Sequence, residues 1–204
     1  SAAPTYGSLA TLQYNTSTSR NTGPEWPAIF SGTGGVVITN TGTITLTDNK
    51  TFSGNPLTIM EGSSLSISNY TLSSPNSLNL YCGGSVSGST ISGSGTLTLG
   101  GDVNVTDAGQ GIAGATVSCP VALGATRTFT VADGGTNSAT DLTVSGIISG
   151  ATFGVTKAGA GTMELSASNN FTGPATINSG ILSVTNLANT GSNSALGTGS
   201  ATGA

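Results

Sequence analysis

The sequence repeats itself, and this feature restricts the fold more than any other. Residues 154–184 read GVTKAGAGTMELSASNNFTGPATINSGILSV, and residues 35–67 are a degenerate copy of them, displaced by 119 positions. Two one-residue deletions make 154–184 the shorter of the two copies. A shorter third copy lies at residues 88–99, displaced by 53 positions from the second. A chain made of similar units folds as a stack in which each unit contacts its neighbours, and not around one central site.

Short runs of alternating apolar and polar residues fill the repeats. The clearest are TITLT at 43–47, SLSIS at 64–68 and SLNLY at 77–81. This period of two is typical of strands with one buried face, and the Gly, Asn, Ser and Asp residues between the runs favour turns. No stretch shows the 3.6-residue period of an amphipathic helix, so we predict an all-β protein.

The spacing of the apolar pairs sets the length of the repeating unit. Such pairs recur at 44/46 and 65/67 in the first part of the chain, and at 142/144, 163/165 and 182/184 in the last part. Coils of about 20 residues with two or three short strands are typical of a β-solenoid, also called a single-stranded β-helix. The predicted inward residues are Ile44, Leu46, Leu57, Ile59, Leu65, Ile67, Leu78, Leu80, Leu97, Leu99, Val103, Val105, Leu142, Val144, Met163, Leu165, Ile177, Leu182 and Val184.

The N-terminal part differs from the rest in composition. Residues 1–33 hold the only tryptophan, Trp26, and three of the seven prolines. Because PEWP at 24–27 cannot form a central strand, we interpret residues 1–33 as an irregular N-terminal cap with Trp26 as its plug. Residues 34–204 are then the β-solenoid, which we expect to continue or stack beyond residue 204. Its C-terminal end shows no comparable cap.

Composition argues against most kinds of chemistry. Only 6% of residues are charged, the net charge is −4 and there is no histidine, which removes the commonest general base and metal ligand. The basic residues Arg20, Lys50, Arg127 and Lys157 are scattered and form no patch for nucleic acid. No apolar run is long enough to span a bilayer. We therefore predict a non-enzymatic chain without catalytic, cofactor-binding or metal-binding residues.

Three charged residues are the main candidates for a functional role despite this composition. Asp102 and Asp107 are the acids closest in sequence, and Asp107 lies in a Gly-rich stretch, so we interpret it as a turn aspartate. A calcium site or a polysaccharide-cleaving site are the alternatives, the second requiring a third acid to converge. Lys157 aligns with Ile38 and Ile91 of the other copies, and we predict that it points outward at a coil corner.

The two cysteines, Cys82 and Cys119, leave two alternatives open. Their separation along the sequence is nearly two coils, or about 9–10 Å along a β-stack. A disulfide needs Cα atoms within about 7 Å, so a bond would require an enlarged coil between them. Either a disulfide or two free thiols fits the sequence.

The repeat resembles the autotransporter-associated β-strand repeat, also called the passenger-associated transport repeat. Ala167 departs from the Gly that the family often has there. The resemblance implies a right-handed β-helix in exported proteins on the outer surface of Gram-negative bacteria, and it supplies no catalytic residue. The matching residues are Gly154, Lys157, Gly159, Gly161, Met163, Leu165, Asn169, Phe171, Thr172, Gly173, Thr176, Ile177, Gly180 and Leu182.

These observations lead to a functional expectation with one main alternative. We expect an extracellular structural protein, whose partner is itself, either in a head-to-tail filament or in a rigid stalk. The alternative is an adhesin or passenger domain that binds glycan or a host surface. That alternative predicts a groove or an exposed ladder of aromatic residues, for which the candidates are Tyr6, Tyr14, Trp26, Tyr70 and Tyr81.

Overall fold

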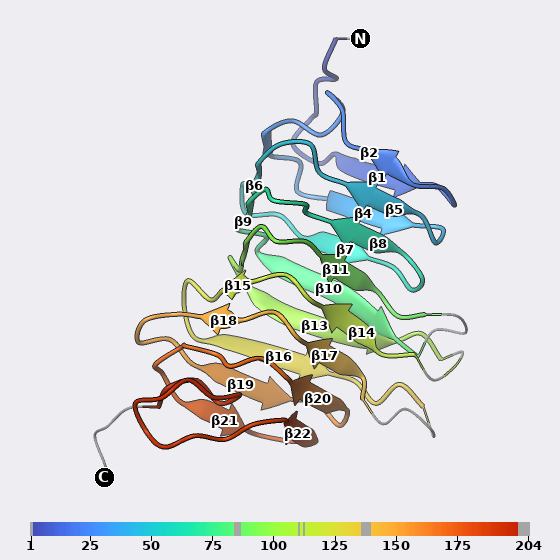
Figure 1. The fold of residues 1–204 in the computed structure, drawn as a ribbon. Helices are drawn as coiled ribbons and strands as arrows, with labels where there is room; N and C mark the ends of the chain where they lie inside the picture. Colours follow the sequence, from blue (N-terminus) through green and yellow to red (C-terminus); the bar gives the residue numbers. More distant parts are fainter. Residues whose placement is uncertain (1, 84–86, 110, 112, 136–139, 200–204) are drawn as a thin grey trace.

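The structure is a computed structural model that describes residues 2–83, 87–109, 111, 113–135 and 140–199 of the chain. Within these ranges the chain forms 22 short strands and no helix. The strands pair in parallel into three sheets, here called A, B and C, and each turn of the chain visits the sheets in that order (Figure 1). The prediction of an all-β solenoid is confirmed.

Each sheet contains one strand from successive coils. Sheet A consists of β1 (Thr11–Asn15), β4 (Gly35–Thr39), β7 (Leu57–Ile59), β10 (Ser77–Cys82), β13 (Asp102–Asp107), β16 (Arg127–Val131), β19 (Val155–Ala158) and β21 (Ala175–Ile177). Sheet B consists of β2 (Arg20–Asn21), β5 (Thr43–Thr45), β8 (Ser64–Ser66), β11 (Thr90–Ser92), β14 (Ala115–Val117), β17 (Leu142–Val144), β20 (Thr162–Leu165) and β22 (Ile181–Val184). Sheet C consists of β3 (Ile29–Phe30), β6 (Lys50–Phe52), β9 (Leu72–Ser73), β12 (Leu97–Thr98), β15 (Val121–Ala122) and β18 (Ile148–Ser149).

The strand register gives the coil length directly. Leu57 pairs with Leu78, and Val155 pairs with Ala175, so these coils have the length that the sequence period predicts. The first coil is longer, since Thr11 pairs with Gly35, 24 residues further on. In the middle of the rod the coil lengthens, as the pairing of Phe129 with Lys157 shows. Part of the extra length lies between sheets A and B, where the connection runs over 83–89 between β10 and β11 but only over 60–63 between β7 and β8.

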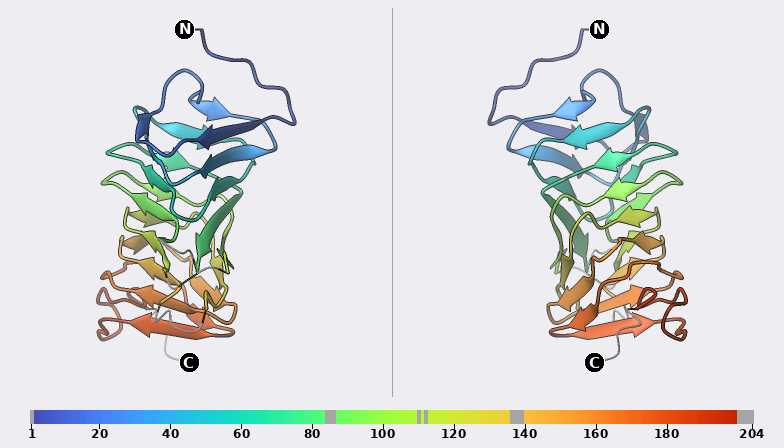
Figure 2. Two further views of the ribbon diagram at one scale, coloured as in Figure 1. Left: turned by 90° about the vertical axis from the view of Figure 1, so that its right-hand side faces the viewer. Right: turned by 90° about the vertical axis from the view of Figure 1, so that its left-hand side faces the viewer.

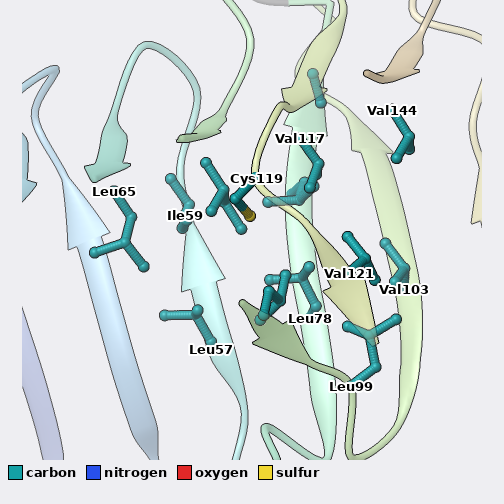
Figure 3. Close-up of a cluster of buried hydrophobic side chains, with 14 of the residues drawn as sticks. Leu57, Ile59, Leu65, Leu78, Leu99, Val103, Val117, Cys119, Val121 and Val144 are labelled. Atoms are coloured by element: carbon teal, nitrogen blue, oxygen red, sulfur yellow. The ribbon is translucent and has the colours of Figure 1, made fainter. Parts of the chain in front are cut away.

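The core is a column of apolar side chains inside the coils (Figure 3). All the predicted inward residues from Ile44 to Leu165 are buried. Ile177 occupies an inward register position opposite Lys157, as predicted, but it is 55% exposed. Leu182 and Val184 are half-buried. These residues lie on β21 and β22, which pair with a coil on one side only, so no further coil among the described residues covers them on the other side.

The N-terminal end contains regular structure that the sequence did not predict. Its strands β1, β2 and β3 form a first coil that pairs with the second coil in all three sheets. Trp26 is fully buried inside this coil, with its ring 5.9 Å from that of Tyr14 and 6.0 Å from that of Phe52. The tryptophan therefore plugs the N-terminal end of the core.

The C-terminal end is partly capped, contrary to expectation. The segment 186–199 folds back and bridges Asn169 to Ser194 in antiparallel fashion. The Asn169 side chain donates to the Ala195 carbonyl (2.8 Å) and accepts from the Ile148 amide (2.7 Å), and Phe171 beside it is fully buried. The cap packs on the residues that follow β18 of sheet C, while no described strand pairs with the outer edges of β21 and β22, at the C-terminal end of the rod (Figure 2).

Candidate functional site

The two acids that were candidates for chemistry, Asp102 and Asp107, each accept a hydrogen bond from a backbone amide. Asp102 Oδ1 accepts from the Thr128 amide (2.9 Å), and Asp107 Oδ1 accepts from the Gly109 amide (2.7 Å) in a local turn. They stand at opposite ends of β13. In the part of the chain that the structure describes, no three acidic, cysteine or histidine side chains gather as a metal-binding group.

The aromatic residues do not form an exposed ladder. The Tyr6 ring packs edge-on against Phe30 at 5.0 Å, and the Tyr14 hydroxyl donates to Glu25 Oε1 (2.8 Å). With Trp26 buried, these side chains belong to the packing of the N-terminal coil. Tyr70 and Tyr81, the remaining candidates, are half-buried.

Lys157 contradicts the prediction that it points outward. It is fully buried, and its Nζ donates to the carbonyls of Ala158 (2.7 Å), Gly159 (2.9 Å) and Ser179 (3.2 Å). Lys157 follows the inward residue Val155 on the same face of β19, so the register directs its side chain into the core. The turn directly after Lys157 supplies two of the carbonyl oxygens that a buried ammonium needs, and the turn of the last coil supplies the third.

Asp141 is the second buried charge in this part of the rod. Its Oδ1 accepts from the Gly134 amide (2.8 Å) and its Oδ2 from the Thr162 amide (2.7 Å), so it joins two neighbouring coils at the corner between sheets A and B. Burial lowers the pKa of Lys157, and the negative charge of Asp141 acts in the opposite direction. Sequence reasoning did not identify Asp141, because a lone aspartate before a strand usually lies in solvent.

A similar arrangement lies near the other end of the rod. Lys50 is buried in β6, donates to the Trp26 carbonyl and pairs with Asp48 at 2.5 Å. Because Asp48 is more than half exposed, this ion pair connects the core to the surface. Both buried lysines therefore stabilise the coils next to the two ends.

The two ends of the rod are its most distinctive surfaces. At the C-terminal end no described strand pairs with the outer side of β21 or β22, and Ile177 and Ile181 are 55% and 59% exposed. At the N-terminal end β1 and β2 also pair on one side only, and the inward residues Leu12 and Tyr14 are half-buried. Unpaired strand edges with apolar side chains form a template for a further coil.

The cysteines are two separate free thiols, both fully buried. Cys82 ends β10, with its Sγ 3.6 Å from the Thr106 carbonyl oxygen, and Cys119 lies between β14 and β15 in the core (Figure 3). Burial raises the pKa of each thiol to about 12. We therefore expect neither thiol to react with an alkylating reagent until the chain unfolds.

Alkaline pH is expected to destabilise the protein through these thiols. The unfolded chain releases their protons near pH 9.0, whereas the folded chain holds them to about pH 12. Since the unfolded state then binds fewer protons, the free energy of unfolding falls with rising pH between these values, by up to about 1.4 kcal/mol per pH unit for each thiol. The lowered pKa of Lys157 acts in the opposite direction. Burial also raises the pKa values of Tyr6 and Tyr14, which add to the loss of stability above about pH 10.

Urea unfolding between pH 8 and about 10.5, followed by circular dichroism, measures this dependence. The double substitution Cys82→Ala and Cys119→Ala is expected to flatten it. An equally steep loss of stability in the double variant would contradict the assignment to the thiols.

Comparison with known proteins supports part of the resemblance. The model of the passenger-associated-transport-repeat family matches residues 155–184, which include β19, β20, β21 and β22. The searches of curated proteins and of solved structures found no match to this chain. No helix among the described residues is long and apolar enough to cross a membrane.

Proposed function

We propose that this chain is a passenger-type structural protein of the outer surface of a Gram-negative bacterium. In this proposal it catalyses no reaction, and its β-solenoid is a rod that stacks end to end on further copies of itself. The family match at 155–184 supports the passenger type and the surface location. The observation that carries the stacking is that both ends leave the edges of sheets A and B unpaired.

The two ends offer matching elements to each other. Sheet A ends on β1 at one end and on β21 at the other, and sheet B ends on β2 and β22. Stacking β21 of one copy on β1 of the next would continue sheet A and bring the exposed inward residue Ile177 towards Leu12 and Tyr14. Each 100 Å² of apolar surface buried in this way stabilises the contact by about 2.5 kcal/mol before the cost of association.

The terminal segments restrict how two copies can meet. At the N-terminal end the residues around Tyr6 pack on β3 of sheet C, where the Ser8 carbonyl accepts from the Thr33 amide (2.8 Å). At the C-terminal end the segment 186–199 covers the sheet C side. Because the terminal segments occupy the sheet C side at both ends, the outer edges of sheets A and B are the ones left for pairing. A contact between unlike ends that does not close into a ring propagates as a filament.

Substitution of Ile177 by lysine tests the proposed contact. We expect the average molecular mass of the wild-type protein, measured by analytical ultracentrifugation, to increase with protein concentration. Electron micrographs should show rods. Ile177→Lys places a charge at the inward position of the open edge, so the concentration needed for assembly should rise about tenfold or more.

The matched control is Ile147→Lys, because Ile147 is 49% exposed but lies on the side of the rod, just before β18. It should assemble as the wild type does. Wild-type protein that stays monomeric at all concentrations, or an equal loss in Ile147→Lys, would reject end-to-end stacking. Dispersed monomers would favour the rigid stalk as the function of the rod.

A further inference from the structure

The side of the rod carries a recess at the corner between sheets A and B, here called the corner recess. Its volume is about 240 Å³. Residues of the turn from β4 to β5 and of the turn from β7 to β8 line it together with Ser87, whose carbonyl accepts from the Gly62 amide (2.9 Å). Its lining includes the side chains of Thr39, Asn40, Thr41, Met60, Glu61 and Ser87.

Glu61 supplies the one charge in the corner recess. Its Oε2 atom is buried from solvent and has no hydrogen-bond partner among the described residues. A buried carboxylate oxygen without a donor is costly, and native proteins seldom keep one without a reason. The atom is therefore a ready acceptor for a hydrogen-bond donor that enters the recess.

The backbone beside Glu61 is strained. Asn40 and Thr41 both have positive φ angles, 69° and 63°. Asn tolerates this conformation, whereas a β-branched residue such as Thr strongly disfavours it. In the next coil the residue in register with Thr41 is Gly62, with φ of 71° and no such strain. Strain of this kind collects at functional sites, and here it keeps a hydroxyl group on the recess.

We propose that the corner recess binds one neutral sugar unit through its hydroxyl groups. The Glu61 carboxylate can accept from two neighbouring sugar hydroxyls, and Thr39, Asn40, Thr41 and Ser87 offer further hydroxyl and amide groups. Met60 supplies an apolar surface for the C–H face of the ring. The volume corresponds to about eight water molecules, which suits a single pyranose ring.

Two other ligand classes fit the corner recess less well. The lining contains no Lys or Arg, and the chain carries a net charge of −4, so an anion would be repelled. Calcium takes about six to eight oxygen ligands, usually with several carboxylates, and the recess has one. The sugar site is independent of end-to-end stacking, because it lies on the side of the rod.

Saturation-transfer NMR with methyl glycosides of glucose, galactose, mannose and N-acetylglucosamine tests the site. The chain should carry Ile177→Lys, so that assembly does not affect the spectra. We expect saturable binding of at least one glycoside in the millimolar range, as is reasonable for a single small ligand. Glu61→Gln, which keeps the shape but removes the charge, should weaken it about tenfold or more. Glu164→Gln is the matched control, because Glu164 lies on β20, far from the recess, and should bind as the parent does.

Thr41→Gly separates binding from stability. It should raise the thermal midpoint slightly by relieving the positive φ, and at the same time weaken glycoside binding. Three results would overturn the proposal: no glycoside in the panel binds, Glu61→Gln binds as tightly as the parent, or calcium chloride alone gives a saturable shift at Glu61 that glycosides do not compete with.

Discussion

Replacing Trp26 with alanine is expected to lower the free energy of unfolding by about 4 kcal/mol. The indole ring is fully buried and contacts the rings of Tyr14 and Phe52, which belong to different coils. Its loss leaves a large cavity in the first coil. The Lys50 ammonium, which binds the Trp26 carbonyl, also loses part of its packing there. Because coils contact mainly their neighbours, the N-terminal coils should unfold first.

Urea unfolding followed by circular dichroism measures this effect, since the variant lacks the only tryptophan and its fluorescence. Trp26→Phe keeps much of the volume and should lose roughly half as much stability. A Trp26→Ala protein as stable as the wild type would show that the tryptophan does not plug the N-terminal end.

Replacing Lys157 with alanine is expected to cost about 3 kcal/mol, the second largest effect. The substitution removes the donor shared by the Ala158, Gly159 and Ser179 carbonyls and opens a cavity between β19 and the last coil. A Cβ atom on Gly180 would lie 2.7 Å from the ammonium nitrogen, so the turn closes tightly around it. The coils nearest the C-terminal end should therefore loosen.

Two further variants separate the hydrogen bonds from the packing. Lys157→Met fills much of the volume without donating, and we expect it to lose about 2 kcal/mol. Arg20→Ala removes an exposed basic residue of β2 and should change stability by less than about 0.5 kcal/mol. If the methionine variant matched the wild type in urea unfolding, the three carbonyl bonds would contribute nothing net.

The sequence period predicted which side chains face the core. Ile44 and Leu65, which the period places one coil apart, are paired in register and both buried. The same period placed Ile177 inward, which is its register position, but periodicity does not reveal whether another coil covers that position. The fold-back of 186–199 was missed because its contacts depend on Asn169 and Ala195, which carry no repeat pattern.

The buried lysine was predictable in part. The repeat alignment places Lys157 on Ile38, which is buried, so the copies themselves indicated an inward position. The charge of Lys157 favoured an outward position, because lysine is seldom fully buried. The carbonyl oxygens of two stacked turns, one directly after Lys157 and one in the last coil, decide the outcome. They are a property of the backbone and not of residue types.

The corner recess had no signal in the sequence. Glu61 stands in an ordinary turn, and that its Oε2 atom is buried without a hydrogen-bond partner among the described residues becomes apparent only in the three-dimensional structure. Thr41 was equally hidden, since positive φ angles are expected at Gly or Asn and not at Thr. A site that forms where turns of unequal length meet can be recognised only once the coils are stacked in three dimensions.

Hydrogen exchange measured at several protein concentrations tests most directly the claim that uncovered coil edges are the working surfaces of this rod. At low concentration, amides of the middle coils should exchange slowly, and those on the open sides of β1, β2, β21 and β22 quickly. With rising concentration we predict that protection increases at these four strands and stays constant elsewhere, and that Ile177→Lys abolishes the increase. Protection that is the same at every concentration, or that rises along the side of the rod instead of at its ends, would contradict the account.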